Sequence, residues 1–397
     1  MGSSKTRAIV AELLDAGDGP SHLRFLGYGE AESQGWHKGL IANLDQVSHS
    51  TKEAVEQAER ASGVPLESAV VGVGGPQIQG ASVASGITLS PYPRELTRED
   101  VRRVVENAGE IPLAKDREIL HMIPGEFVLD SQKGIMDPIG MQGCYLGVKS
   151  HIVSGSVRAM QNVVTAVNRA GVLVETTVLE AFAAAEVVLS EEERELGVLV
   201  AVLGGGTCDV VVYKNRGLRM TAVIPIGGDH FTSDVALGLH TAIRDAEAVK
   251  KSFGSVQRNL GKESTTIEIP GMGERASWFV PNSALTDILA SRAEEMFGLI
   301  LDEVLGCGLD RQIGAGVVLC GGGAKLRGIC DVSEQILEGP TRLGLPPKIT
   351  DMPAMLESPE YTTLIGLLLY AQKLWRLRSN PVNKSLGSIW KSLLART

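Results

Sequence analysis

The sequence has few of the features that mark secreted, zinc-binding or membrane-spanning proteins. Of its 397 residues five are cysteines and 4% are aromatic. The cysteines form no Cys-x-x-Cys pair and no Cys/His cluster with zinc spacing, so we expect free thiols in a reducing compartment and no metal site of this kind. The longest apolar run is about eight residues, 364–371. That is far short of the ~20 residues needed to span a bilayer, so we expect no membrane-spanning segment.

Acidic residues are absent after Glu360, although the whole chain has a formal net charge of −9. The segment after Glu360 carries six bases: Lys373, Arg376, Arg378, Lys384, Lys391 and Arg396. Without them, 32 basic and 47 acidic residues leave a net charge of −15. An acidic body argues against a protein that wraps nucleic acid, and we expect no nucleic-acid partner.

No G-x-x-x-x-G-K-[ST] motif is present, and no G-x-G-x-x-G motif opens a helix. Instead, two apolar segments, 198–203 and 316–320, each run into a glycine triplet and a small residue. A continuous apolar strand is typical of a sheet covered on both faces. Glycines directly after such a strand let backbone N–H groups approach an anion. One triplet alone favours a tight turn, but two of them favour a phosphate-binding cleft between two lobes.

The rest of the pattern is that of an α/β protein with an inserted module. Helices are predicted at 43–62, 97–108, 156–170 and 180–196, with another beginning near Asp229. Strands are predicted at 6–13, 23–29 (its hairpin partner), 69–73, 118–129, 145–154, 173–178 and 198–203. Thr97 and Asp100 have the spacing of a capping box at the start of a helix. Gly227 and Gly228 precede the helix near Asp229, which suits an anion at a helix N-terminus.

Several motifs resemble known families. The segments Leu203-Gly204-Gly205-Gly206-Thr207-Cys208-Asp209 and Val318-Leu319-Cys320-Gly321-Gly322-Gly323-Ala324-Lys325-Leu326 resemble the second phosphate loop and the adenosine loop of the actin/Hsp70/sugar-kinase superfamily. Residues 224–236, 246–250 and 363–371 more narrowly resemble the FtsA family of bacterial cell-division proteins. The resemblance implies an α/β, actin-like two-lobe ATPase fold with an FtsA-type inserted subdomain and a C-terminal amphipathic helix.

The implied domains follow the family's order. They are the first part of lobe 1 at 1–81, the inserted subdomain at 82–161, the rest of lobe 1 at 162–197, lobe 2 at 198–378 with its own insertion near 235–312, a linker at 379–383 and a membrane-binding helix at 384–397.

The resemblance also implies ATP as the cofactor. The residues that it places at the nucleotide are Gly2, Ser3, Ser4, Lys5, Gly204, Gly205, Gly206, Thr207, Cys208, Asp209, Gly227, Gly228, Asp229, Glu247, Lys250, Gly321, Gly322, Gly323 and Lys325. Glu180 matches the acidic position near the metal or the attacking water. An ordinary first-turn acid, favoured by the helix dipole, is the alternative interpretation of Glu180.

Two departures from the family pattern concern carboxylates. The family's first strand supplies an Asp just before its Gly-Thr/Ser loop, whereas this sequence begins at that loop. Either a misplaced start codon or a trimmed chain would explain this, as would a genuine loss. The second loop has Val202 where the family has an Asp. Such carboxylates position hydrated Mg²⁺, so we expect weakened Mg²⁺ binding and ATP binding with weak or no hydrolysis.

The C-terminal segment has the pattern of an interfacial helix. At 100° per residue its large apolar residues cover an arc of about 140°. These residues are Leu386, Ile389, Trp390, Leu393 and Leu394, and the bases around them are Lys384, Lys391 and Arg396. Such a helix fits the surface of an anionic bilayer, whereas a helix docked on the protein's own body is the alternative. One tail would bind weakly, and many tails on a polymer would bind firmly.

These features together predict an actin-like division protein at the cytoplasmic face of the bacterial inner membrane. The family resemblance implies polymerisation, tethering of FtsZ to anionic inner-membrane lipids and recruitment of later division proteins. Arg292 and Glu295 are candidate FtsZ contacts, although a solvated helix face would look the same. The alternatives are a small-metabolite kinase, which would need a carboxylate base that does not stand out, and an actin-like adaptor of a pilus system.

Overall fold

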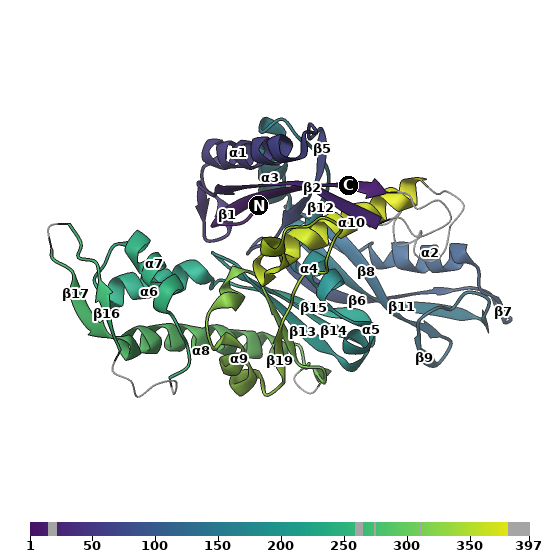
Figure 1. The fold of residues 1–397 in the computed structure, drawn as a ribbon. Helices are drawn as coiled ribbons and strands as arrows, with labels where there is room; N and C mark the ends of the chain where they lie inside the picture. Colours follow the sequence, from purple (N-terminus) through teal and green to yellow (C-terminus); the bar gives the residue numbers. More distant parts are fainter. Residues whose placement is uncertain (15–21, 259–264, 274, 310–311, 380–397) are drawn as a thin grey trace.

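A computed structural model describes residues 1–14, 22–258, 265–273, 275–309 and 312–379 (Figure 1). The elements form two lobes and a module inserted into the first. In Figure 1 the inserted module and the hairpin of β16 (Thr266–Ile269) and β17 (Trp278–Pro281) lie at opposite ends of the molecule. Among the described residues, no helix combines the length and the apolar character that crossing a bilayer requires.

Lobe 2 is built on one five-stranded sheet with the order β15-β14-β13-β18-β19. The strands are β13 (Val198–Leu203), β14 (Cys208–Lys214), β15 (Gly217–Ile224), β18 (Val317–Cys320) and β19 (Thr341–Leu343). Strand β13 pairs antiparallel with β14 and parallel with β18. All six residues of β13 are buried, as the continuous apolar pattern predicts.

The helices of lobe 2 cover one face of this sheet. They are α6 (Gly228–Gly238), α7 (Ile243–Phe253), α8 (Asn282–Gly306) and α9 (Ile329–Leu337). Helix α8 buries Leu285, Leu289, Ala293, Met296 and Ile300, whose spacing places them on one helical face. The alternate side chains of β13 point to different cores, one under these helices and one shared with lobe 1.

Besides the short pairing of Trp36–His37 with Leu40–Ile41, lobe 1 contains two longer, separate strand pairs in the described residues. The pairs are the antiparallel hairpin of β1 (Lys5–Leu14) and β2 (His22–Glu32), and the parallel pair of β12 (Leu173–Leu179) and β5 (Ser68–Val73). Their helices are α1 (Leu44–Ser62), α3 (Val157–Arg169), α4 (Glu180–Val188), α5 (Glu191–Leu196) and α10 (Thr362–Ser379). Figure 1 shows α1 on one side of the β1–β2 hairpin and α10 crossing on the other. The hairpin predicted from the sequence is confirmed.

The single helix predicted over 180–196 is wrong, because it breaks into α4 and α5. Leu189 has extended backbone, with ψ at 134°. The Ser190 hydroxyl then accepts a hydrogen bond from the Glu193 N–H, and the Glu193 carboxylate accepts one from the Ser190 N–H. This capping box starts a new helix, which a purely periodic pattern does not reveal.

The inserted module is a four-stranded antiparallel sheet, β6-β11-β8-β9, with one helix packed against it. Its elements are β6 (Gln79–Thr88), α2 (Arg98–Ala108), β8 (Arg117–Leu129), β9 (Gln132–Ile135) and β11 (Tyr145–Ser156). The predicted capping box of Thr97 and Asp100 is confirmed. Hydrogen bonds from Arg94 hold the pKa of Asp100 below its usual range.

Two buried histidines join this module to the lobes. The Leu179 N–H donates a 2.9 Å hydrogen bond to His121 Nε2, and His151 Nε2 lies 3.0 Å from Thr221 Oγ1 of lobe 2. Burial lowers the pKa of each histidine to about 4, so both are neutral near pH 7. These two contacts are therefore uncharged polar bonds, and the ion pair of Glu126 with Arg219 adds a charged contact to lobe 2.

The remaining elements are short. They are β3 (Trp36–His37), β4 (Leu40–Ile41), β7 (Arg94–Glu95), β10 (Gln142–Gly143), β16 (Thr266–Ile269), β17 (Trp278–Pro281) and the 3₁₀ turns η2 (Gly322–Lys325), η3 (Ala354–Glu357) and η4 (Pro359–Tyr361). The helix predicted over 384–397 lies outside the described residues, as does most of the predicted linker.

Candidate functional site

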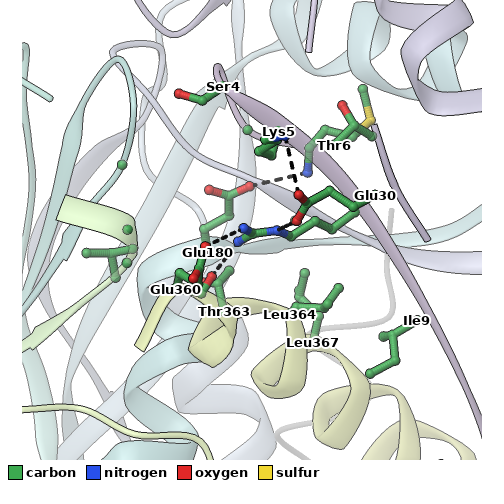
Figure 2. Close-up of a pocket in the computed structure, with 18 of the residues that line it drawn as sticks. Ser4, Lys5, Thr6, Ile9, Glu30, Glu180, Glu360, Thr363, Leu364 and Leu367 are labelled. Atoms are coloured by element: carbon green, nitrogen blue, oxygen red, sulfur yellow. Dashed lines mark hydrogen bonds and ion pairs between the residues drawn. The ribbon is translucent and has the colours of Figure 1, made fainter. Parts of the chain in front are cut away.

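A cavity of about 1,070 Å³ lies between the lobes. Most of the predicted nucleotide residues line it: Gly2, Ser3, Ser4, Lys5, Gly204, Gly205, Gly227, Gly228, Asp229, Glu247, Lys250, Gly321, Gly322, Gly323 and Lys325, together with Glu180. Figure 2 shows the lobe 1 side of this cavity, where Ser4 and Lys5 lie above Glu180 and α10 forms the floor. The structure thus brings together predicted residues as far apart in the sequence as Gly2 and Lys325.

The two glycine triplets meet because they follow neighbouring parallel strands. Gly321 has a φ of +84°, and a Cβ there would lie 2.5 Å from the Leu203 carbonyl oxygen. A Cβ on Gly323 would lie 2.8 Å from the Cβ of Leu203. A Cβ on Gly322, in contrast, would have no described atom within 4 Å. Close packing therefore requires glycine at positions 321 and 323, whereas Gly322 leaves space in the cavity.

The loop after β13 is hydrogen-bonded to the start of α6. The N–H groups of Gly228 and Asp229 each donate 2.9 Å bonds, to the carbonyl oxygens of Gly204 and Gly205. The Gly227 N–H donates to His230 Nδ1 at 3.1 Å. The prediction that this helix N-terminus suits an anion is therefore not supported, since the structure gives these N–H groups protein partners. The same bonds rigidly position the loop that follows β13.

The N-terminal loop faces this second loop across the cavity. The Ser4 hydroxyl donates a 3.4 Å hydrogen bond to Asp229 Oδ1. A Cβ on Gly206 would lie 2.8 Å from Ser3 Oγ, so the two loops approach closely. Ser3, Ser4 and the glycines at 204 and 205 thus line one cavity, and small residues of this kind let a chain of phosphates approach the backbone.

Helix α7 contributes a charged pair on the lobe 2 side. Lys250 Nζ donates a 2.9 Å hydrogen bond to the Gly228 carbonyl oxygen and lies 2.6 Å from Glu247 Oε2. Thr232 Oγ1 donates to the same carboxylate. Burial alone would raise the pKa of Glu247, but hydrogen bonds from Lys250 and Thr232 hold it below its usual value. The Glu247 carboxylate is therefore ionised, and its contacts with Lys250 hold both side chains against the loop.

Two carboxylates lie together beside the cavity: Glu180 lines it, whereas Asp209 lies outside the lining. A Cβ on Gly74 would lie 3.3 Å from both Asp209 Oδ1 and Glu180 Oε2. The Gly75 N–H donates a 3.0 Å hydrogen bond to Asp209 Oδ1. Burial, and then the charge of Glu180, raise the pKa of Asp209 to about 7. Asp209 is therefore partly protonated at neutral pH.

This pair fits a hydrated Mg²⁺ only partly. Mg²⁺ usually keeps several waters and binds one or two carboxylates together with substrate phosphates. Asp209 and Glu180 supply that number of carboxylates, although no described group of three or more His, Cys, Asp or Glu side chains has a metal-binding arrangement. Val202, where the superfamily has an Asp, is buried and apolar.

Other predicted residues lie outside the cavity lining. Cys208 is fully buried in the core of lobe 2, where burial raises the pKa of its thiol well above the usual value. Gly206 and Thr207 belong to the turn of the second loop, in which the Gly204 N–H donates to the Thr207 carbonyl oxygen.

The predicted FtsZ contacts lie on α8, away from the cavity. Arg292 Nη2 donates a 2.8 Å hydrogen bond to Asp234, and its Nη1 donates a 2.6 Å bond to Glu295. The Glu295 side chain is 53% exposed. The membrane-binding residues 384–396 lie outside the described part of the chain.

Sequence reasoning missed two groups of residues. Gly74 and Gly75 follow a buried strand, and this signal was visible but was not assigned to the site. Arg7, Glu30 and Glu360 form an ion network at the cavity wall. No local pattern could reveal that network, because Arg7 and Glu360 are separated by 353 positions.

Comparison with known proteins identifies the family. The family model described as cell division protein FtsA matches residues 202–366, and the model of the SHS2 domain inserted in FtsA matches residues 75–154. Cell division protein FtsA of Pseudomonas aeruginosa is 34% identical over 93% of this chain and 87% of its own length. The Neisseria meningitidis protein is 33% identical, over 94% and 89%, and that of Bacillus subtilis 31%, over 96% and 84%.

Solved structures agree on the architecture. The PilM–PilN type IV pilus biogenesis complex has a TM-score of 0.65 at 17% identity, over 93% of this chain and 96% of the other. Ethanolamine utilization protein EutJ from Carboxydothermus hydrogenoformans has a TM-score of 0.50 at 16% identity, over 93% and 87%. At these identities the likeness shows the fold alone, so it does not favour a pilus adaptor. The predicted actin-like fold with its inserted subdomain is confirmed, and the chain belongs to the FtsA family of bacterial cell-division proteins.

Proposed function

We propose that this protein is a nucleotide-binding division adaptor that polymerises and tethers FtsZ to the inner membrane. Its site of action would be the cytoplasmic face of that membrane at the division site, where it would also help to recruit later division proteins. The observation that carries the nucleotide proposal is the meeting of two glycine triplets at the ends of β13 and β18 beside one cavity. Membership of the FtsA family supports the division role.

The cavity has distinct chemistry for the two ends of ATP. Residues 2–5, Gly204 and Gly205 would face the phosphates, with the ammonium group of Lys5 nearby. Gly321, Gly322 and Gly323 would back the adenosine, bordered by Glu247 and Lys250. Because Gly322 leaves open space, a planar base can approach the backbone there.

Weak or absent hydrolysis follows from the carboxylates. Mg²⁺, when bound, would neutralise charge on the phosphates. Asp209 and Glu180 would hold it, but a partly protonated Asp209 is a poor ligand until a cation displaces its proton. Val202 contributes no further oxygen. We therefore expect nucleotide binding through backbone groups to exceed metal-assisted turnover.

The nucleotide proposal is tested by filling the open space at Gly322. Gly322→Leu would enter the cavity without striking a described atom at its Cβ, so we expect normal folding and at least a tenfold rise in the Kd for ATP, worth about 1.4 kcal/mol. Gly306→Leu, at an equally open position at the end of α8, is the matched control. Calorimetric titration gives the Kd values of the unsubstituted chain and of each variant for ATP and for ADP. If Gly322→Leu binds nucleotide as tightly as the unsubstituted chain, the proposed cleft is contradicted.

The tether is tested by co-sedimentation of FtsZ with anionic vesicles. The full chain should recruit FtsZ, and a chain ending at Asn380 should not. Ile389→Glu places a charge in the apolar stripe, whereas Ser388→Glu places the same charge on the opposite face and serves as the control. Recruitment that survives the truncation would sink the tether proposal.

The FtsZ contact on α8 is tested separately. Glu295→Lys reverses an exposed charge and should weaken FtsZ binding in solution if this helix face is the contact. Arg292 is the less informative position, because its ion pair with Asp234 makes any substitution structural as well.

A further inference from the structure

A row of charged side chains crosses from lobe 1 to the glycine loop of lobe 2. Arg7 on β1 donates 2.8 Å hydrogen bonds from Nε to Glu30 and from Nη2 to Glu360. The other carboxylate oxygen of Glu360 accepts a 2.6 Å bond from Lys325 Nζ on η2. In Figure 2, Glu360 lies at the cavity wall next to the first turn of α10. The Arg7 guanidinium bridges Glu360 and Glu30. Glu360 is thus the common partner of both lobes.

These contacts are more sheltered than ordinary surface ion pairs. The side chains of Arg7 and Glu360 are 18% and 21% exposed. Burial alone would raise the pKa of Glu360, but the hydrogen bond from Lys325 and the charge of Arg7 hold it below its usual value. The Arg7 guanidinium also lies 4.4 Å from the ring centroid of Tyr361. Charge-assisted bonds in such surroundings hold their geometry better than exposed pairs do.

The main chain follows the same path. The Gly321 N–H donates a 2.8 Å hydrogen bond to the Pro359 carbonyl oxygen, so η4 contacts the second triplet directly. Helix α10 begins immediately after η4, at Thr362. A displacement of the loop at 321–325 therefore reaches the first turn of α10 through both a backbone bond and the Lys325–Glu360 pair.

We propose that Arg7, Glu360 and Lys325 form a strap that couples the glycine loop of the cleft to helix α10. Lys325 lines the cavity and is 54% exposed, so an anionic ligand can compete with Glu360 for its ammonium group. When that happens, Glu360 keeps Arg7 and loses its side-chain link to lobe 2. The ligand arm of this device rests on the proposed function, because it needs a nucleotide in the cleft. Helix α10 precedes residues 384–397 in the sequence. The strap would therefore couple ligand binding in the cleft to the predicted membrane-binding segment.

The strap itself is tested without nucleotide, by amide hydrogen exchange on the full chain. Glu360→Gln removes the charge and keeps the shape, and exchange should accelerate severalfold at 321–326 and at 361–366 together. Glu12→Gln is the matched control, since it breaks the exposed Glu12–Arg24 pair on the same β1–β2 hairpin and leaves the contacts of Glu360 in place. Acceleration on one side only, or equal acceleration in the control, would overturn the coupling.

A double-mutant cycle adds a second readout. Arg7 and Lys325 meet only through Glu360, so the effects of Arg7→Met and Lys325→Met on exchange at 361–366 should be non-additive. Additive effects would mean two independent contacts and no strap. All these variants keep a folded core by near-ultraviolet circular dichroism if the effect is local.

An experiment with ADP distinguishes failure of this inference from failure of the proposed function. Saturating ADP should change exchange at 361–366 in the unsubstituted chain, and by less than half as much in Glu360→Gln. If ADP binds both chains and changes both equally, the strap transmits nothing and the inference fails. If ADP binds neither, the nucleotide proposal fails, and the nucleotide-free experiments still decide whether the strap exists.

Discussion

The two lobes differ in how completely their sheets are joined. Lobe 2 has five strands in one hydrogen-bonded sheet, and every residue of β13 is buried. Apart from the two-residue strands β3 and β4, the described strands of lobe 1 form two separate pairs, and most of β1 is only half-buried. The cavity extends between those pairs, lined by Ala8, Val70, Leu364 and Leu367 among others.

This difference indicates where packing holds the molecule together. Side chains in a close-packed core make contacts on all sides, whereas those lining a cavity lack partner atoms on one side. Lobe 2 is therefore a tightly packed platform that presents both glycine triplets, and lobe 1 contains spare volume beside the same cleft. Substitutions of the same type should have unequal effects in the two lobes.

The largest contrast is expected from deleting leucine side chains. Leu289→Ala on α8 removes a fully buried side chain from the lobe 2 core and should lower the free energy of unfolding by about 3 kcal/mol. Leu367→Ala on α10 enlarges an existing cavity and should cost about 1 kcal/mol. Urea unfolding of both variants measures the difference, and equal costs would show that the two cores are packed alike.

Adding side-chain volume should also destabilise lobe 2 more than lobe 1. Ala201→Leu on β13 has no room in the lobe 2 core and should destabilise by roughly 2–3 kcal/mol. Ala8→Leu on β1 points into the cavity lining and should be nearly neutral, within about 0.5 kcal/mol. Thermal unfolding of the pair is the measurement. Strong destabilisation by Ala8→Leu would contradict the spare volume in lobe 1.

The smallest effect concerns the carboxyl group of Asp209, which faces lobe 1 from lobe 2. Its folded pKa of about 7 lies above the value of an unfolded Asp, so the folded state binds more protons between about pH 4 and 7. Its contribution to stability is thus present below pH 4 and is lost as pH rises toward 7. Asp209→Asn removes this titration and should stabilise the protein at pH 8 by about 1 kcal/mol.

The control for that prediction is Asp287→Asn, which changes an exposed carboxylate on α8. The free energy of unfolding is measured at pH 4, 6 and 8. Its dependence on pH should become weaker in Asp209→Asn and stay unchanged in Asp287→Asn. A pH profile that is unchanged by Asp209→Asn would mean that this carboxyl group titrates normally in the folded protein.

Local elements were predictable because their signals lie within a few residues. Asn43 accepts hydrogen bonds from the N–H groups of Asp45 and Gln46 at the start of α1, and Gly63 ends that helix with a φ of +69°. The break between α4 and α5 was missed, because the Ser190–Glu193 capping box lies inside a pattern that reads as one helix. The periodicity of apolar residues did not separate the two helices.

The sequence by itself determined the buried strands, the glycine triplets after them and the family that they indicate. Only the tertiary structure decided that the N–H groups at the start of α6 have protein partners, that Asp209 lies beside Glu180, and that Arg7 meets Glu360. The physical reason is distance along the chain. Helix caps, turns and strand patterns depend on neighbours, whereas the charge state of a buried carboxyl group and the partners of a cavity residue depend on packing between segments hundreds of residues apart.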